Sequence, residues 1–279
     1  MIWRLTVNEL VKIFGKWRSY IGFIAIGVLI PLTLWGIAQS APSIEQSIQR
    51  QMRSDFILIG SVFNGLFATY MIMNFLWIHI PFLIALVAGD VVAGEGASGT
   101  LRIYLTRSAS RFQVLSAKII ATFIYTAVLI LFFALMSLGV GSLWLGSGDL
   151  VVMEQGILIL PENMAWIRFG FSFLFAIAMM LVVAILCFML STMVNNSIGP
   201  IIGGIAVIII GLAISNIPIE FFETIRPYVF THYFDLWQQP FKDPMRWDEI
   251  WRSFRVLGIY SAIFISVSYI VFIRKDILS

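Results

Sequence analysis

The residues of this chain that offer chemistry gather in one stretch, from Asp90 to Lys118. The stretch carries two carboxylates and four cationic side chains, and it separates two long apolar runs. Carboxylates can hold a metal ion, arginines can bind phosphate or pair with acids, and glycine-rich loops can cradle phosphate groups. Metal binding, phosphate binding and contact with a charged partner are therefore the functions to weigh.

The pattern argues against the first two functions. The stretch has no Gly-x-x-x-x-Gly-Lys-Ser/Thr motif and no strand pattern before its glycines, and its acids, Asp90 and Glu95, are not a set that holds magnesium. The whole chain has two histidines and one cysteine, and its apolar runs contain no acidic pair. We therefore expect no catalytic residue, no metal site and no enzymatic activity in this chain.

A docking element fits the stretch better. Its glycines permit a tight reversal of the chain, and Ser98 or Thr100 can cap a short helix that follows. That helix would present apolar side chains with a charge beside them: Leu101, Tyr104 and Leu105, with Arg102 nearby. Such a surface is typical of contact with a partner.

The composition places this docking element in a membrane protein. Of the 279 residues, 60% are hydrophobic and 12% are charged, whereas about 25% of a soluble domain is charged. No segment outside the apolar runs is long enough to bury a core of its own. We therefore predict a single all-α membrane domain over residues 1–279. The net charge is +3. In a membrane protein basic residues set the topology, so this charge does not predict a nucleic-acid partner.

The apolar runs predict six transmembrane helices. They cover about residues 20–38, 63–88, 119–145, 169–190, 198–215 and 254–273. Lys118, at the near end of the third helix, is able to snorkel toward water. Polar side chains in the second run are candidates for a substrate path, or alternatively for hydrogen bonds between helices. They are Asn64, Asn74 and His79.

Two further segments are expected at the membrane surfaces. Residues 1–18 have an apolar stripe typical of an interfacial amphipathic helix. The stripe includes Trp3, Leu10, Phe14 and Trp17. Residues 216–253 mix aromatic rings, prolines and charges, which favours short helices at or dipping into the opposite surface.

Charge distribution predicts the orientation. Six crossings place both termini and residues 90–118 on one side of the membrane. That side holds ten of the eighteen Lys and Arg residues but four of the fifteen acids. Because basic residues in short loops face the cytoplasm, we expect both termini and the polar stretch to be cytoplasmic.

The central stretch resembles the pattern of ABC transporter permeases of the type-2 exporter family. The residues that carry the resemblance are Asp90, Glu95, Gly99, Thr100, Leu101, Leu105, Ser110, Arg111 and Lys118. The amphipathic start, the six-span layout and the ending from Phe272 to Ile277 agree with it. Ser108 and Ala117 depart from the pattern, because the family commonly has proline and glycine at these positions.

The resemblance implies a permease subunit that binds no cofactor itself. Two permease subunits, identical or different, would pair in the cytoplasmic (inner) membrane of a prokaryote. Two separate cytoplasmic ATPase subunits, carrying ATP and magnesium, would bind beneath them. The stretch after the second span would be the coupling helix. The residues implied to make or support the ATPase contact are Asp90, Glu95, Gly99, Thr100, Leu101, Arg102, Tyr104, Leu105, Arg107 and Arg111.

Two alternatives to an ATP-driven exporter stay open. A permease with its ATPase can do mechanical or envelope-assembly work instead of moving a solute, and the sequence does not separate these outputs. A stand-alone secondary transporter is the other alternative. Such transporters usually have repeated halves, discontinuous helices or buried carboxylates, whereas the six predicted spans contain no Asp or Glu. The substrate is not readable from the sequence.

Overall fold

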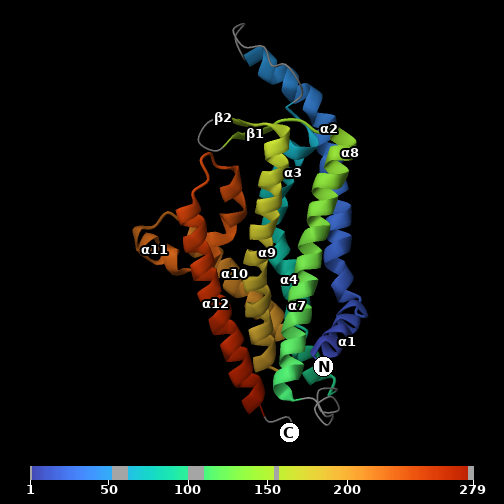
Figure 1. Cartoon of the computed structure of the whole chain (residues 1–279), viewed down its shortest axis with the longest axis vertical. Coiled ribbons are helices and arrows are strands. Elements are labelled where there is room, and N and C mark those ends of the chain that lie inside the picture. The colour runs from blue at the N-terminus through green and yellow to red at the C-terminus, as the bar shows by residue number, and fades with distance from the viewer. Residues whose placement is uncertain (1, 52–61, 100–109, 154–156, 276–279) are drawn as a thin grey trace.

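The fold is a bundle of long helices, seen here in a computed structural model (Figure 1). The structure describes residues 2–51, 62–99, 110–153 and 157–275. Six of the described helices are long and apolar enough to cross a membrane. The chain is therefore a predominantly helical, multi-pass membrane protein, as the hydropathy predicts.

An amphipathic helix, α1 (Ile2–Phe14), begins the described chain and packs against the third span. Its inward stripe is Thr6, Glu9 and Ile13, all of them buried. The predicted stripe from Trp3 to Trp17 is not this inward stripe, and α1 ends at Phe14, so Trp17 lies beyond the helix. Trp3 and Trp17 are exposed, and Leu10 and Phe14 are partly buried. The placement of α1 at a membrane surface stays a prediction.

The first span, α2 (Arg18–Gln51), is longer than predicted. The sequence predicts a polar loop after residue 38, but the helix continues for several more turns, and this part of the prediction is wrong. The extension is rich in glutamine, which sustains a helix well outside an apolar environment. Pro31 and Pro42 both lie inside α2.

The second span is interrupted. It consists of α3 (Gly65–Leu76), the 3-10 turn η1 (Trp77–His79) and α4 (Ile80–Ala88). Asn64 caps α3, because its Oδ1 accepts hydrogen bonds from the backbone N–H groups of Leu66 and Phe67, each at 3.0 Å. Pro81, at the start of α4, has no backbone N–H to donate, which explains the break in the helical pattern just before it.

The third span begins earlier than predicted. A short helix, α5 (Ala93–Ala97), follows the second span, and α7 (Arg111–Ala134) starts at Arg111. Ser110 and Gln113 form a capping box that fixes this start. The span continues through a π-helical turn, η2 (Leu135–Val140), into α8 (Gly141–Leu145).

A small β-hairpin covers the end of the bundle opposite to α1 (Figure 1). Strands β1 (Leu150–Met153) and β2 (Ile157–Leu160) pair antiparallel, with Leu150 opposite Leu160. Leu150, Val152 and Leu160 are buried, and β1 contacts α3. The all-α prediction therefore holds for the spans but omits this hairpin.

The fourth span, α9 (Glu162–Met193), is the central helix of the bundle. It contacts α4, α7, α10, α12 and η4, and it is the most buried of the six candidate spans. The fifth and sixth spans are α10 (Ile198–Asn216) and α12 (Trp247–Arg274). Three short elements connect them: α11 (Glu220–Ile225), η3 (Arg226–Tyr228) and η4 (Phe230–Phe241).

The connection between the last two spans is anchored inside the bundle. In Figure 1, α11 projects sideways about halfway along. The following 3-10 helix, η4, buries Trp237 against Tyr70 and Phe241. Trp77 Nε1 also donates to the carbonyl of Phe234 at 3.0 Å. The η4 part of the segment predicted at the membrane surface thus contributes most of its side chains to the core, whereas α11 and η3 bury none.

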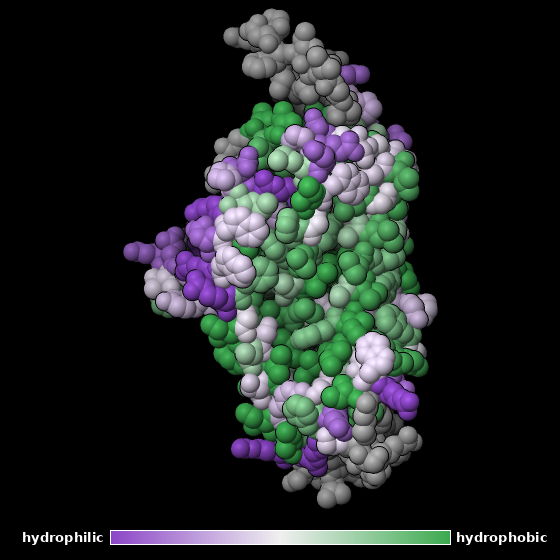
Figure 2. Space-filling model, in the orientation of Figure 1, coloured by the Kyte–Doolittle hydropathy of each residue, from purple (hydrophilic) through white to green (hydrophobic). Residues whose placement is uncertain are grey.

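The surface has an apolar belt between two polar ends (Figure 2). On the side where α11 projects, hydrophilic residues reach farther toward the middle of the belt than elsewhere in this view. Exposed apolar residues of α2, α7, α10 and α12 make up much of the belt. This distribution is the one expected for a surface in contact with lipid.

We predict that Gly65→Ala destabilises the protein. A Cβ at Gly65 would lie 2.5 Å from the backbone carbonyl carbon of Gly141 and 2.5 Å from the backbone nitrogen of Ser142, so two elements would have to separate. Overpacking of this kind costs about 1–3 kcal/mol. Thermal unfolding in detergent micelles should give a lower Tm. Gly36→Ala is the matched control, because a Cβ there meets nothing within 4 Å. Equal Tm values for the two variants would contradict the close approach.

Candidate functional site

The most unusual polar group in the described chain is the ammonium of Lys118. Lys118 lies on α7 and its side chain is 0% exposed. Its Nζ is 2.7 Å from Glu9 Oε2 and 2.8 Å from Glu95 Oε2, and it also donates to the carbonyl of Val91 at 3.3 Å. A buried charge is tolerated only when it is paired and hydrogen-bonded. These contacts meet that requirement.

A second lysine completes the pairing of the two glutamates. Lys12 Nζ lies 2.7 Å from Glu9 Oε1 and 2.8 Å from Glu95 Oε1. Burial alone would lower the pKa of Lys12, but the hydrogen bonds and the charges of Glu9 and Glu95 outweigh it and raise the pKa above its ordinary value. Each of the two lysines thus contacts both glutamates, which makes four ion pairs in total.

Asp90 adds a second set of ion pairs beside the first. One of its oxygens, Oδ2, is 2.7 Å from Lys16 Nζ, and the other, Oδ1, is 3.2 Å from Arg18 Nη1. Gly94 covers this carboxylate so closely that a Cβ would lie 2.5 Å from Asp90 Oδ1. We call the seven charged residues the ion cluster: Glu9, Lys12, Lys16, Arg18, Asp90, Glu95 and Lys118.

Four parts of the chain supply the ion cluster, and neutral hydrogen bonds hold two of them in place. The turn that leads into α5 is fixed by Ser191 of α9, whose Oγ accepts from the backbone N–H groups of Val92 and Ala93 at 3.1 and 2.8 Å. The start of α2 is fixed by Tyr125 of α7, whose hydroxyl donates to the carbonyl of Ser19 at 2.9 Å. The ion cluster therefore joins α1 and the turn after it, the start of α2, the region from Asp90 to α5, and α7.

The ends of α9 and α12 are tied at the same level. Arg111, in the first turn of α7, donates to the carbonyls of Ile273 and Lys275 at 2.7 and 3.0 Å. Lys275 in turn donates to the carbonyls of Thr192 and Val194 at the end of α9, both at 3.1 Å. Cations near the last carbonyls of a helix satisfy groups that lack intrahelical partners.

The ion cluster has no room for a substrate. The cavity beside it has a volume of about 20 Å³, which is enough for roughly one water molecule. No group of three or more metal-ligating side chains occurs among the described residues. The arrangement can hold elements together and pass a displacement between them, but it offers no space in which a bound molecule could react.

Comparison with known proteins identifies the family. The model of the family described as "Protein of unknown function (DUF2705)" matches residues 22–278. The chain belongs to this family. A curated relative, the uncharacterized protein YhcI of Bacillus subtilis (strain 168), is 26% identical over 198 residues, which are 69% of this chain. The matched region spans 63% of the length of that relative.

Several predicted docking residues of this DUF2705 chain have known positions. Asp90 and Glu95 point into the ion cluster, and Glu95 is 12% exposed. Arg111 binds the end of α12. Gly99 is exposed and has a φ of +68°, a backbone conformation that favours glycine. Thr100, Leu101, Arg102, Tyr104, Leu105 and Arg107 lie outside the described residues.

The candidate path residues are not brought together. Asn64 caps α3 and donates to the carbonyl of Asp149 at 2.7 Å. Asn74 donates to the carbonyl of Tyr70 at 2.9 Å and accepts from Gln238 Nε2 at 3.1 Å. His79 is exposed on the surface of the bundle. These contacts favour the alternative reading, in which the asparagines form structural hydrogen bonds.

Sequence reasoning missed the central part of the ion cluster. The prediction that Lys118 can snorkel toward water is wrong, because its side chain is fully buried. Glu9, Lys12 and Lys16 were not candidates. A signal was present, since Glu9 is the only acid among residues 1–18 and Lys118 stands alone within an apolar helix. The sequence did not indicate that the two residues meet.

We predict that Lys118→Met strongly destabilises the protein. The change removes a buried cation and leaves Glu9 and Glu95 with Lys12 as their remaining cluster partner. Breaking a buried ion pair by removing one partner costs about 3–5 kcal/mol, so thermal unfolding in detergent should show a markedly lower Tm.

Two further variants make this result specific. The double variant Glu9→Gln with Lys118→Met removes one charge of each sign and should recover part of the lost stability. Arg4→Ala, an exposed cation on the same helix as Glu9, should change the Tm little. If Lys118→Met behaved like Arg4→Ala, the ion cluster would not stabilise the fold as described.

Proposed function

We propose that this chain is the membrane permease subunit of an ATP-driven ABC exporter, with ATP hydrolysis performed by a separate subunit. The observation that carries the proposal is the ion cluster. It fixes α5 and the start of α7, and these two elements flank residues 100–109, where the resemblance places the ATPase contact. A partner that pushes on this region would act on a firmly attached part of the bundle.

The contacts provide a route for such a displacement. Glu95 connects α5 to Lys118 of α7 and to Lys12 of α1. Ser191 connects the same region to α9. Because a buried ion pair separates only at a cost of several kcal/mol, these elements should move as one body. Closure of an ATPase dimer would then tilt the second and third spans together with α1.

The role proposed for the acidic residues is positioning. Asp90 and Glu95 are engaged with cations of this chain, so we assign the direct partner contact to the residues from Ala97 onward. Ala97, Ser98 and Gly99 are exposed at this end of the bundle. In this scheme Leu101 and its apolar neighbours supply the anchors, and the acids hold the anchors in place.

The complete assembly follows from the resemblance. It would contain two permease subunits and two cytoplasmic ATPase subunits that bind ATP and magnesium. We place it in the cytoplasmic membrane of a prokaryote, with both termini in the cytoplasm. The excess of basic residues at the end of the bundle that holds α1 supports this orientation.

Cysteine labelling tests the orientation. The native Cys187 is buried, so an introduced exposed cysteine should be the main reactive thiol. Ser98→Cys should react with a membrane-impermeant maleimide only after the cells are opened. Ser147→Cys, an exposed position between the third and fourth spans, should react in intact cells. Labelling of Ser98→Cys from outside would exclude a cytoplasmic docking element.

Co-purification tests the partner. The tagged chain, purified from cells that make it natively, should bring down a nucleotide-hydrolysing subunit. Leu101→Asp should reduce the recovered subunit about tenfold or more, as expected for loss of an apolar anchor at an interface. Arg4→Ala serves as the control and should leave recovery unchanged. Absence of a nucleotide-hydrolysing partner from the native preparation would contradict the proposed function.

A further inference from the structure

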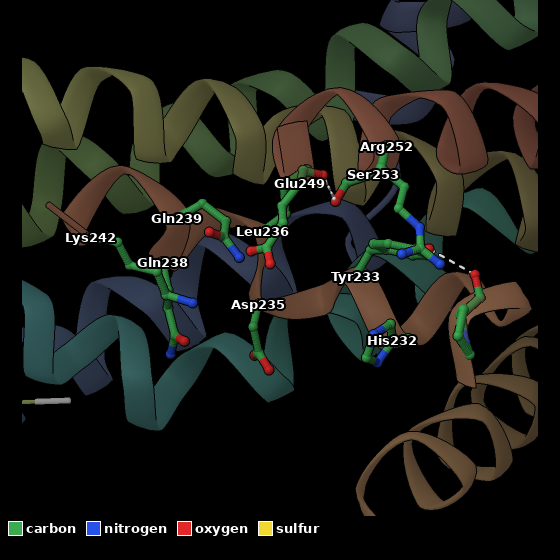
Figure 3. A pocket seen from close by; sticks show the side chains of 11 residues that line it. His232, Tyr233, Asp235, Leu236, Gln238, Gln239, Lys242, Glu249, Arg252 and Ser253 are labelled. Carbon is green, nitrogen blue, oxygen red and sulfur yellow. Dashed lines mark hydrogen bonds between the residues drawn. The ribbon is translucent and has the colours of Figure 1, made fainter. Parts of the chain in front are cut away.

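A polar pocket lies between η4 and the first turns of α12 (Figure 3). Its volume is about 360 Å³, within the range of sites that bind small molecules. Figure 3 shows its two walls: η4 contributes residues from His232 to Gln239, and α12 contributes Glu249, Arg252 and Ser253. The pocket is distant in the fold from the ion cluster, and no residue is common to the two.

Charges of both signs line this pocket. Arg252 and Lys242 are cationic, and Asp235 and Glu249 are acidic. Glu249 also pairs with Arg246 at 2.8 Å. Arg246 is 58% exposed, so this pair is weak and can be exchanged at little cost. A ligand that carries an anion and a cation close together would match such a lining.

Burial lowers the pKa of His232 below its ordinary value, and the charges of Arg226 and Arg252 lower it further, against the opposing charge of Asp235. These effects favour the neutral imidazole, which adds polar atoms to the lining without adding a positive charge. A ligand in this pocket therefore meets two acidic and two basic side chains.

The η4 wall is held rigidly by the helices behind it. Arg168 of α9 donates to the carbonyls of Pro240 and Lys242 at 2.7 and 3.1 Å. Ser172 of α9 donates to the carbonyl of Trp237 at 2.8 Å. A lining that is fixed before a ligand arrives loses little conformational entropy on binding.

The carboxylates of the lining favour an ammonium that can donate hydrogen bonds. Glu249 and Asp235 both line the pocket, and their oxygens are acceptors. A primary ammonium has N–H groups to donate to them, whereas a quaternary ammonium has none.

Aromatic side chains place the pocket near a membrane surface. Tyr228, Trp247 and Trp251 each lie within two residues of a lining residue in the sequence, and they are 73%, 47% and 64% exposed. Exposed tryptophan and tyrosine rings favour the level of the lipid headgroups. The pocket is therefore within reach of the headgroup layer.

We infer that this pocket binds a zwitterion in which a primary ammonium lies close to an anionic group, as in phosphoethanolamine. The phosphate lies toward Arg252, and the ammonium lies toward Glu249 and Asp235. The source is either the headgroup of a membrane lipid or a free solute with the same headgroup chemistry. This inference is independent of the ATPase partner.

The test uses the full-length protein in lipid nanodiscs. Discs made with phosphatidylethanolamine are compared with discs made with phosphatidylcholine or phosphatidylglycerol, and bound lipid is counted by native mass spectrometry after detergent release. A separate arm adds free glycerophosphoethanolamine to phosphatidylcholine discs. We expect preferential retention of phosphatidylethanolamine. Binding of the free compound would assign the site to a soluble zwitterion, and its failure to bind would assign it to the lipid.

Variants connect the preference to the pocket. Arg252→Ala should weaken retention about tenfold, which is the loss expected for one charged hydrogen bond. Glu249→Gln should abolish the discrimination between ethanolamine and choline, because it removes a charged acceptor for the ammonium. Arg255→Ala, an exposed cation one turn along the same helix, should change neither.

Each possible result decides the question. Arg252 is exposed, so its removal should leave the fold intact, and an unchanged Tm verifies this. Equal retention of the three lipids, stronger retention of phosphatidylglycerol, or equal behaviour of Arg252→Ala and Arg255→Ala would overturn the inference.

Discussion

An ammonium group removed from water must be paired, and Lys118 imposes this requirement on the fold. The residue is fully buried on a helix that is long enough to cross a membrane. An unpaired charge there would cost several kcal/mol. Its carboxylate partners, Glu9 and Glu95, come from α1 and α5. Satisfying one cation therefore determines how three separate parts of the chain meet.

The opposite half of the molecule satisfies a buried cation in a different way. Arg168 is nearly buried, and its guanidinium donates mainly to backbone carbonyls at the end of η4. Those hydrogen bonds fix a short 3-10 helix against α9 and leave the other side of η4 open as a pocket. At the end of the bundle that holds α1, the charges pair with one another in the compact ion cluster. The half that contains η4 keeps a space that a polar molecule can enter.

The parts predicted correctly are those set by hydropathy over about 20 residues. All six spans occur where the apolar runs place them, because burial of backbone polar groups in lipid requires helices. The boundaries were less predictable. The third span starts at Arg111, since Ser110 and Gln113 cap it, and α2 continues to Gln51. Local capping and the helix propensity of polar residues decide such ends, and hydropathy does not record either.

The sequence by itself determined that the chain is a helical membrane protein, which segments cross, and where its charged stretch lies. These features depend on local composition, and local composition is readable along one chain. Only the tertiary structure decided the partners of each charge. Glu9 and Lys118 are 109 residues apart in the sequence, and Arg168 lies 72 and 74 residues before the two carbonyls that it binds. No local sequence pattern indicates either pairing. Pairing at such distances follows from how the helices pack, because a buried charge accepts whichever counter-charge or carbonyl the packing brings within hydrogen-bonding distance.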